Sequence, residues 1–180
     1  ISVPDSRVKM ILDAVQGPVV MAVEELKVEG TVLVRSQMEE IIQDYPEAVE
    51  ESFWVKEEDT FYIIFTSGST GVPKGVQIPY ECLNHYLEWS VNLGTKKAEK
   101  EGKVFLNQAP FSFDLSVMDL YTCLACGGTL KPLDKNTQND FGRLFTSLRD
   151  SGAAVWVSTP SFADVCLADP NFDQSLLPQM

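Results

Sequence analysis

The spacing of hydrophobic residues in the first third of the chain predicts short elements separated by turn residues. After Asp5 or Ser6, which can cap a helix, apolar residues recur at helical intervals at Val8, Ile11, Leu12 and Val15. Gly17 is placed to end this helix. The apolar run PVVMAV that follows predicts a short buried strand, and FYIIF at 61–65 predicts a fully buried one.

Two further helices are predicted before residue 95. Ser36 and Glu39 form an S-x-x-E capping box ahead of MEEIIQDY, and Pro46 ends that helix. A longer amphipathic helix is predicted from about Tyr80 to Asn92, with Gly94 as its terminator.

From residue 104 onward, strand-like and helix-like segments alternate. VFLNQA, TLKPLD and AVWVS predict strands, whereas DLSVMDLYTCLACGG, NDFGRLFTSLRDSG and SFADVCLAD predict helices. Such alternation favours crossover connections between parallel strands. The sequence therefore predicts an α/β fold, a mostly parallel sheet with helices on its faces, with residues 1–180 forming one α/β unit.

The acidic composition limits the classes of partner. The chain has 14 Lys and Arg against 26 Asp and Glu, a formal net charge of -12, which repels nucleic acid and anionic membranes. No apolar run approaches the roughly 20 residues that span a bilayer, so we expect no membrane insertion. Nine acidic residues and one lysine, Lys56, lie between residues 39 and 59; this stretch predicts a solvated surface rather than a metal site.

The four cysteines are too few for a disulfide framework, which favours a reducing compartment and a cytoplasmic protein. Cys123 and Cys126 form a C-x-x-C, and Cys82 and His85 have helical spacing, so a four-ligand zinc site is one alternative. The stronger alternative is that the C-x-x-C thiols are small buried hydrophobes and that His85 lies on a helix surface. We therefore predict no metal site.

The segment FTSGSTGVPKG at 65–75 has the composition of a phosphate-binding loop. Glycines let backbone N–H groups approach an anion, hydroxyls add donors, and Lys74 supplies a mobile charge. A flexible surface turn has the same residue types and remains the alternative. The segment is not a Walker A loop, because Pro73 and Gly75 occupy two of its required positions and the residues after Lys74 predict a strand rather than a helix.

The string IIFTSGSTGVPK resembles the phosphate-loop signature of the adenylate-forming enzymes, a superfamily of acyl-CoA synthetases, luciferases and peptide-synthetase adenylation domains. The resemblance implies that the chain is part of the large N-terminal domain of such an enzyme, which uses ATP and Mg²⁺. It assigns seven residues to the ATP phosphates: Thr66, Ser67, Gly68, Ser69, Thr70, Gly71 and Lys74.

The segment FSFDLSVMDLY at 111–121 carries the second constellation. Asp114 precedes a predicted helix, so one interpretation is an N-cap that accepts backbone N–H groups. The residues Phe113 to Ser116 also match an F-D-x-S pattern of amino-acid-activating members of the superfamily. That resemblance implies that Asp114 pairs with the ammonium group of an amino acid substrate.

Within the superfamily, the chain is most similar to the ligases that activate D-alanine and load it onto the phosphopantetheine arm of a D-alanyl carrier protein for teichoic acid esterification. SVPDSRVKMILDAV and VWVSTPSFADVCLADPNFDQSLLP also resemble stretches of those enzymes. The alternatives are a nonribosomal peptide synthetase adenylation domain and a non-catalytic nucleotide-binding module of the same fold.

The other functional motifs of the superfamily lie beyond Met180: the adenine and ribose contacts, the hinge, and the catalytic lysine of the C-terminal domain. We therefore expect no catalytic residue among residues 1–180, and we expect these residues alone to be inactive as a ligase.

Overall fold

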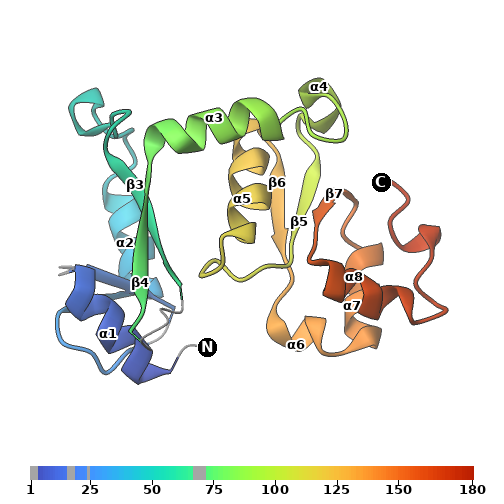
Figure 1. Cartoon of the computed structure of the whole chain (residues 1–180), viewed down its shortest axis with the longest axis horizontal. Coiled ribbons are helices and arrows are strands. Elements are labelled where there is room, and N and C mark those ends of the chain that lie inside the picture. Colours follow the sequence, from blue (N-terminus) through green and yellow to red (C-terminus); the bar gives the residue numbers. More distant parts are fainter. Residues whose placement is uncertain (1–3, 16–18, 24, 67–71) are drawn as a thin grey trace. The chain divides into compact units, whose positions relative to one another are not determined.

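The computed structural model describes residues 4–15, 19–23, 25–66 and 72–180 (Figure 1). They fall into two units, Ile1–Tyr80 and Glu81–Met180, each of which is described by itself. None of the described helices is both long enough and apolar enough to span a membrane.

The first unit contains two helices, one 3-10 turn and four strands. They are α1 Asp5–Val15, β1 Val19–Ala22, β2 Thr31–Val34, α2 Arg35–Asp44, η1 Glu51–Phe53, β3 Thr60–Thr66 and β4 Lys74–Pro79. β1 and β2 pair in parallel, and β3 and β4 pair antiparallel. The predicted helix, strand and loop order is confirmed, except that no pattern identified β2. The expected burial of the PVVMAV strand is wrong, because Val19 is 50% and Met21 is 74% exposed in β1. Gly17, the expected end of α1, lies outside the described residues.

The start of α2 differs from the predicted capping box. The helix begins at Arg35, so Ser36 lies inside it instead of capping it. The Gln37 side chain accepts a hydrogen bond from the Val34 N–H at 3.0 Å, and Glu39 pairs with Arg35 at 2.8 Å. Gln37, at the third helical position, thus takes the part that Glu39 has in the predicted capping box: its side chain accepts the N–H of the N-cap residue, here Val34.

The strand β3 is less buried than its apolar sequence predicts. Ile63 is 39% exposed, and its neighbours Tyr62 and Ile64 are only half-buried. Within the described residues β3 has one strand neighbour, β4, and the pair forms a two-stranded sheet. A fully buried strand needs cover on both faces, so the expectation of full burial is wrong for this chain.

The second unit alternates helices with three strands, as predicted. Its elements are α3 Tyr80–Ser90, α4 Lys97–Lys100, β5 Val104–Asn107, α5 Leu115–Ala125, β6 Thr129–Pro132, α6 Lys135–Gln138, α7 Phe141–Arg149, β7 Ala153–Val157, α8 Pro160–Leu167 and η2 Gln174–Leu176. The strand order is β6-β5-β7, and both pairs are parallel.

Helices cover both faces of this parallel sheet, and β5 runs through its centre (Figure 1). Phe105 and Leu106 are both 0% exposed but belong to different clusters. Phe105 packs with Val91, Cys123 and Cys126 on the α5 face, whereas Leu106 packs with residues of α7, α8 and η2 on the other face. Successive residues of a strand point to opposite faces, so one dipeptide anchors both halves of the core.

The turn between α5 and β6 requires both of its glycines. Gly127 has φ +58°, in the left-handed region that glycine adopts at a helix C-terminus. A Cβ on Gly128 would lie 2.7 Å from the Lys103 carbonyl oxygen and 2.9 Å from the Phe105 ring. The backbone therefore passes against β5 at a distance that no side chain allows.

We predict that Gly128→Ala destabilises this chain by about 1–3 kcal/mol, because the clash involves backbone rather than a flexible side chain. The measurement is the urea midpoint of unfolding, followed by tryptophan fluorescence.

Gly142→Ala is the matched control. Gly142 lies within α7, where a Cβ would meet only the Asp140 side chain at 3.3 Å. Alanine favours a helix, so stability should stay the same or rise by up to about 1 kcal/mol. Equal midpoints for the two variants would contradict the close approach at Gly128.

Candidate functional site

The predicted phosphate loop joins the two strands of the β3–β4 hairpin. Thr66 ends β3 and is directly opposite Lys74, which begins β4. The prediction that Lys74 starts a strand rather than a helix is confirmed, which removes the Walker A alternative. Ser67, Gly68, Ser69, Thr70 and Gly71 lie outside the described residues, so their assignment to ATP stays a prediction.

Close packing behind the loop explains one further glycine of the motif. A Cβ on Gly75 would lie 3.1 Å from both the Ile63 side chain and the Phe65 ring. The hairpin therefore brings β4 tightly across β3 immediately beside Thr66 and Lys74.

The Lys74 side chain is exposed, and its ammonium group has no carboxylate partner among the described residues. The two ion pairs found there are Arg35–Glu39 and Arg143–Asp140. The Thr66 hydroxyl donates to the Lys74 carbonyl oxygen at 3.4 Å, which links the two strand ends. A cation that stays unneutralised at the mouth of a hairpin is available to an anionic ligand.

Arg7 is a residue near the loop that the sequence did not identify. Its guanidinium Nη2 donates to the Phe65 carbonyl oxygen at 3.3 Å, and the side chain is half-buried. The contact joins α1 to the end of β3, directly before the loop. Because the two residues are 58 positions apart, no local pattern indicated the pair.

Asp114 lies in the second unit, at the N-cap position of α5, and it is exposed. Its side chain makes no capping hydrogen bond, so the N-cap interpretation of its carboxylate is wrong. The helix start is held instead by Ser116, whose hydroxyl donates to the Phe113 carbonyl oxygen at 2.7 Å. The Asp114 carboxylate is thus presented to solvent without a structural role in the cap.

The chain topology places Asp114 at the carboxyl edge of the parallel sheet. β5 and β7 are neighbours, but the helices that follow them, α5 and α8, pack on opposite faces. In open α/β sheets, ligands bind where adjacent strands send their connections in opposite directions. The segment 108–114 leaves β5 at such a point.

Asp119 and Asn107 form a buried pair below this edge, and neither was recognised in the sequence. Asp119 is 1% exposed and Asn107 is 4% exposed. The Asn107 Nδ2 donates to Asp119 Oδ2 at 3.1 Å and to the Ala109 carbonyl oxygen at 2.9 Å. Burial raises the pKa of Asp119 above its ordinary 3.8, and the hydrogen bond from Asn107 partly opposes this rise.

A recognisable signal for this pair exists in the helix sequence. The polar residues Ser116, Asp119 and Thr122 follow one another at intervals of three within an otherwise apolar helix, and all three are buried. Polar side chains on the core-facing side of a helix need partners, so their spacing indicates a hydrogen-bonded network.

The two thiols of the C-x-x-C behave as buried hydrophobes, which confirms the preferred interpretation. Cys123 and Cys126 are 1% and 2% exposed, and burial raises the pKa of both thiols. Cys82 and His85 are exposed on α3. Within the part of the chain that the structure describes, no three His, Cys, Asp or Glu residues gather as a metal site.

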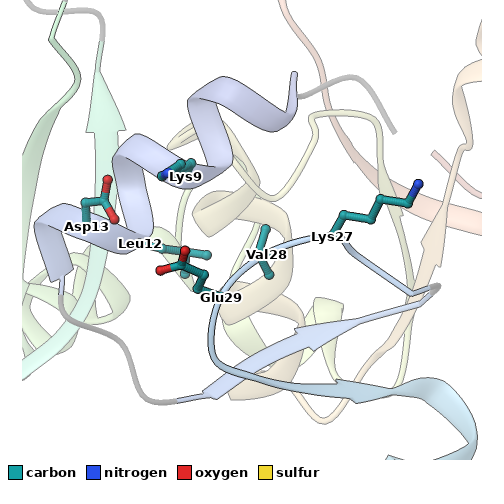
Figure 2. A pocket seen from close by; sticks show the side chains of 6 residues that line it. All are labelled: Lys9, Leu12, Asp13, Lys27, Val28 and Glu29. Atoms are coloured by element: carbon teal, nitrogen blue, oxygen red, sulfur yellow. The ribbon is translucent and has the colours of Figure 1, made fainter.

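A cavity of about 350 Å³ in the first unit does not coincide with either motif. Figure 2 shows that its lining comes from one side of α1 and from the segment 27–29: Lys9, Leu12, Asp13, Lys27, Val28 and Glu29. Its two lysines and two carboxylates are all exposed. This mixed charge favours neither an anion nor a cation, so the cavity is not assigned to the site.

Thr66 and Lys74 are therefore brought together at the hairpin in the first unit, while Asp114, Asn107 and Asp119 belong to the second. Each of these two groups of described residues lies within a single unit.

Comparison with known proteins gives a consistent result. The family described as "AMP-binding enzyme" matches residues 2–179. A D-alanine--D-alanyl carrier protein ligase from Bacillus velezensis is 44% identical over 99% of this chain, which covers 35% of that protein. A ligase of the same name from Bacillus licheniformis is 55% identical over 71% of this chain and is covered to 25%. The chain thus spans about a third of the relatives it matches.

Solved structures show the same fold at low identity. The o-succinylbenzoate CoA synthetase from Bacillus subtilis, in complex with its acyl-adenylate intermediate, matches 98% of this chain with a TM-score of 0.72 and 18% identity; the match covers 45% of that chain. The N-terminal domain of FACL13 from Mycobacterium tuberculosis matches 99% of this chain with a TM-score of 0.75 and 15% identity, covering 46% of that domain chain.

We predict that Asp119 and Asp134 affect stability with opposite pH dependence. The pKa of Asp119 is raised in the folded chain, so its contribution to stability is lost as pH rises from about 3.8 through the raised pKa. Asp119→Asn should therefore gain stability relative to the wild type as pH rises above 4.

The Asp134→Asn variant is the control with the reverse sign. Hydrogen bonds from Thr137 and Asn136 lower the pKa of Asp134, so its contribution is present above 3.8 and is lost as pH falls. Melting temperatures of both variants and the wild type between about pH 2 and 7, a range that extends below 3.8, provide the measurement. Difference curves of the same slope for the two variants would contradict the assigned directions.

Proposed function

We propose that this chain, which belongs to the AMP-binding enzyme family, carries two sites of an AMP-forming ligase. These are the ATP phosphate loop and the site for the ammonium group of an amino acid. The whole protein would activate D-alanine with ATP and transfer it to a carrier protein, as the names of its curated relatives say of those proteins. Teichoic acid D-alanylation in the cytoplasm is the proposed setting.

The observation that carries the proposal is the state of two charged side chains. Lys74 and Asp114 are exposed, the one without a described ion pair and the other without a capping bond. A polyphosphate and an ammonium group are the ligand charges that these residues complement. An amino acid and ATP together supply both.

The proposed reaction has two steps. The D-alanine carboxylate attacks the α-phosphate of Mg²⁺-bound ATP, which forms D-alanyl-AMP and releases pyrophosphate. The phosphopantetheine thiol of the carrier protein then takes the alanyl group and releases AMP. In the first step Lys74 and the hydroxyls from Thr66 to Thr70 would hold and neutralise the β and γ phosphates, while Asp114 would orient the substrate through its ammonium group.

We predict that Lys74→Ala in the full-length protein raises the KM for ATP by roughly 10- to 100-fold, because the variant loses one charge-assisted hydrogen bond to the phosphates. Ser67→Ala should have a smaller effect of the same kind. The assay is D-alanine-dependent exchange of pyrophosphate into ATP, with Lys56→Ala as the control because Lys56 is an exposed lysine of the same unit. Equal KM values for ATP in Lys74→Ala and Lys56→Ala would remove the phosphate assignment.

We predict that Asp114→Ala raises the KM for D-alanine by roughly tenfold or more and leaves the KM for ATP nearly unchanged. Asp114→Asn should lie between this variant and the wild type, because it keeps an acceptor oxygen but loses the charge. Asp164→Ala, an exposed aspartate on α8, is the control. A rise in the KM for ATP equal to that for D-alanine would argue against an ammonium site at Asp114.

A further inference from the structure

The connection from β5 to α5 is fixed at its start by the side chain of Asn107. A primary amide has two N–H donors, and both are used: one reaches the Ala109 carbonyl oxygen at 2.9 Å and the other reaches Asp119 at 3.1 Å. The backbone of Asn107 is held as well, because its carbonyl oxygen accepts the Leu133 N–H at 2.9 Å. The orientation of the amide is thereby determined.

Asp119 connects this amide to the helix that begins beside Asp114. It lies in α5, five residues after Asp114, and it is almost completely buried. A buried carboxylate is costly unless it is hydrogen-bonded, so removing the Asn107 donor from Oδ2 would weaken its compensation, while Oδ1 keeps the Leu120 N–H. The contact therefore holds α5 against the end of β5.

The other end of the connection is held by the first turn of α5. The Phe113 carbonyl oxygen accepts from both the N–H and the hydroxyl of Ser116, at 3.0 and 2.7 Å. Ser116 is 3% exposed. Asp114 thus lies between two fixed points. Ala109 is bound to Asn107, which is itself bound to Asp119 of α5, and Ser116 lies in α5.

We propose that Asn107 and Asp119 are positioning residues, which set the place of the Asp114 carboxylate by tying the segment 108–114 to α5. This inference rests on the proposed role of Asp114 as the ammonium-binding residue. It assigns a function to two buried side chains that touch no substrate themselves.

The test compares substitutions at the pair in the full-length protein by pyrophosphate exchange. Asn107→Ala and Asp119→Ala should each raise the KM for D-alanine about tenfold, as expected for loss of a buried hydrogen bond, with little change in the KM for ATP. Asp119→Asn keeps an oxygen that accepts from Asn107, so it should restore a KM for D-alanine near that of the wild type. If Asn107→Ala does not fold, Asn107→Ser replaces it, because its short hydroxyl cannot reach both partners.

Ser90→Ala is the matched control. The hydroxyls of Ser90 and Thr122 lie 2.9 Å apart in a buried hydrogen bond that also holds α5, but not at the segment 108–114. This variant should leave the ratio of the two KM values unchanged. The positioning role is wrong if Ser90→Ala shifts that ratio as much as Asn107→Ala does, or if neither shifts it.

Amide hydrogen exchange separates failure of this inference from failure of the proposed function. Exchange in peptides covering residues 108–117 should be faster in Asn107→Ala than in Ser90→Ala, while peptides of α7 exchange alike in both. This readout needs no activity. Absence of D-alanine-dependent pyrophosphate exchange in the wild-type protein would overturn the proposed function. Equal amide hydrogen exchange at residues 108–117 in Asn107→Ala and Ser90→Ala would overturn the tie through Asn107.

Discussion

The second unit depends on one strand that is covered on both sides. Phe105 and Leu106 are completely buried on opposite faces of β5, so α5 on one face and α7 with α8 on the other are fixed relative to a single backbone segment. β5 then ends at Asn107, whose amide transmits that fixed position to Ala109 and Asp119. Burial of these side chains stabilises the unit, and the two hydrogen bonds of the Asn107 amide fix the position of the segment 108–114.

The alternation of elements was predictable because β5 and β7 are short, mainly apolar runs and turn residues separate the strands of the second unit from its helices. The predictions failed where a local pattern competes with its context. At α2 the S-x-x-E motif suggested a cap at Ser36, yet the N-cap is Val34, two residues earlier, and Gln37 satisfies the Val34 N–H. At β3 an apolar run suggested full burial, but pairing with β4 alone leaves Ile63 exposed. At β3 tertiary cover decided the outcome, and sequence spacing carries little information about it. At α2 a nearby side chain, Gln37, decided it through a local hydrogen bond.

The candidate site was predictable where it consists of exposed, sequence-local chemistry and hidden where it consists of buried support. Lys74 and Asp114 were found because each lies within a short string that resembles a known signature. Asn107, Asp119 and Arg7 act through partners far along the chain, and Arg7 contacts a carbonyl 58 residues away. The spacing of Ser116, Asp119 and Thr122 indicates a buried polar network, but the partner of each side chain, such as Asn107 for Asp119, is identified only in the fold.

Charges in this chain separate into those satisfied by the protein and those left available. Asp119 is buried and hydrogen-bonded, and Lys100, which is 5% exposed, donates to the carbonyl oxygens of Val91 and Thr95. The nine acidic residues between residues 39 and 59 are exposed. At physiological salt the electrostatic effect of such exposed charges is largely screened beyond about 8 Å. The net charge of -12 does not by itself prevent an anion from binding at Lys74, because donors in contact with the anion act within that distance while charges farther away are screened. Among the described residues neither the Lys74 ammonium nor the Asp114 carboxylate has an ion-pair partner, so the two side chains suit ligand groups of opposite charge, one anionic and one cationic.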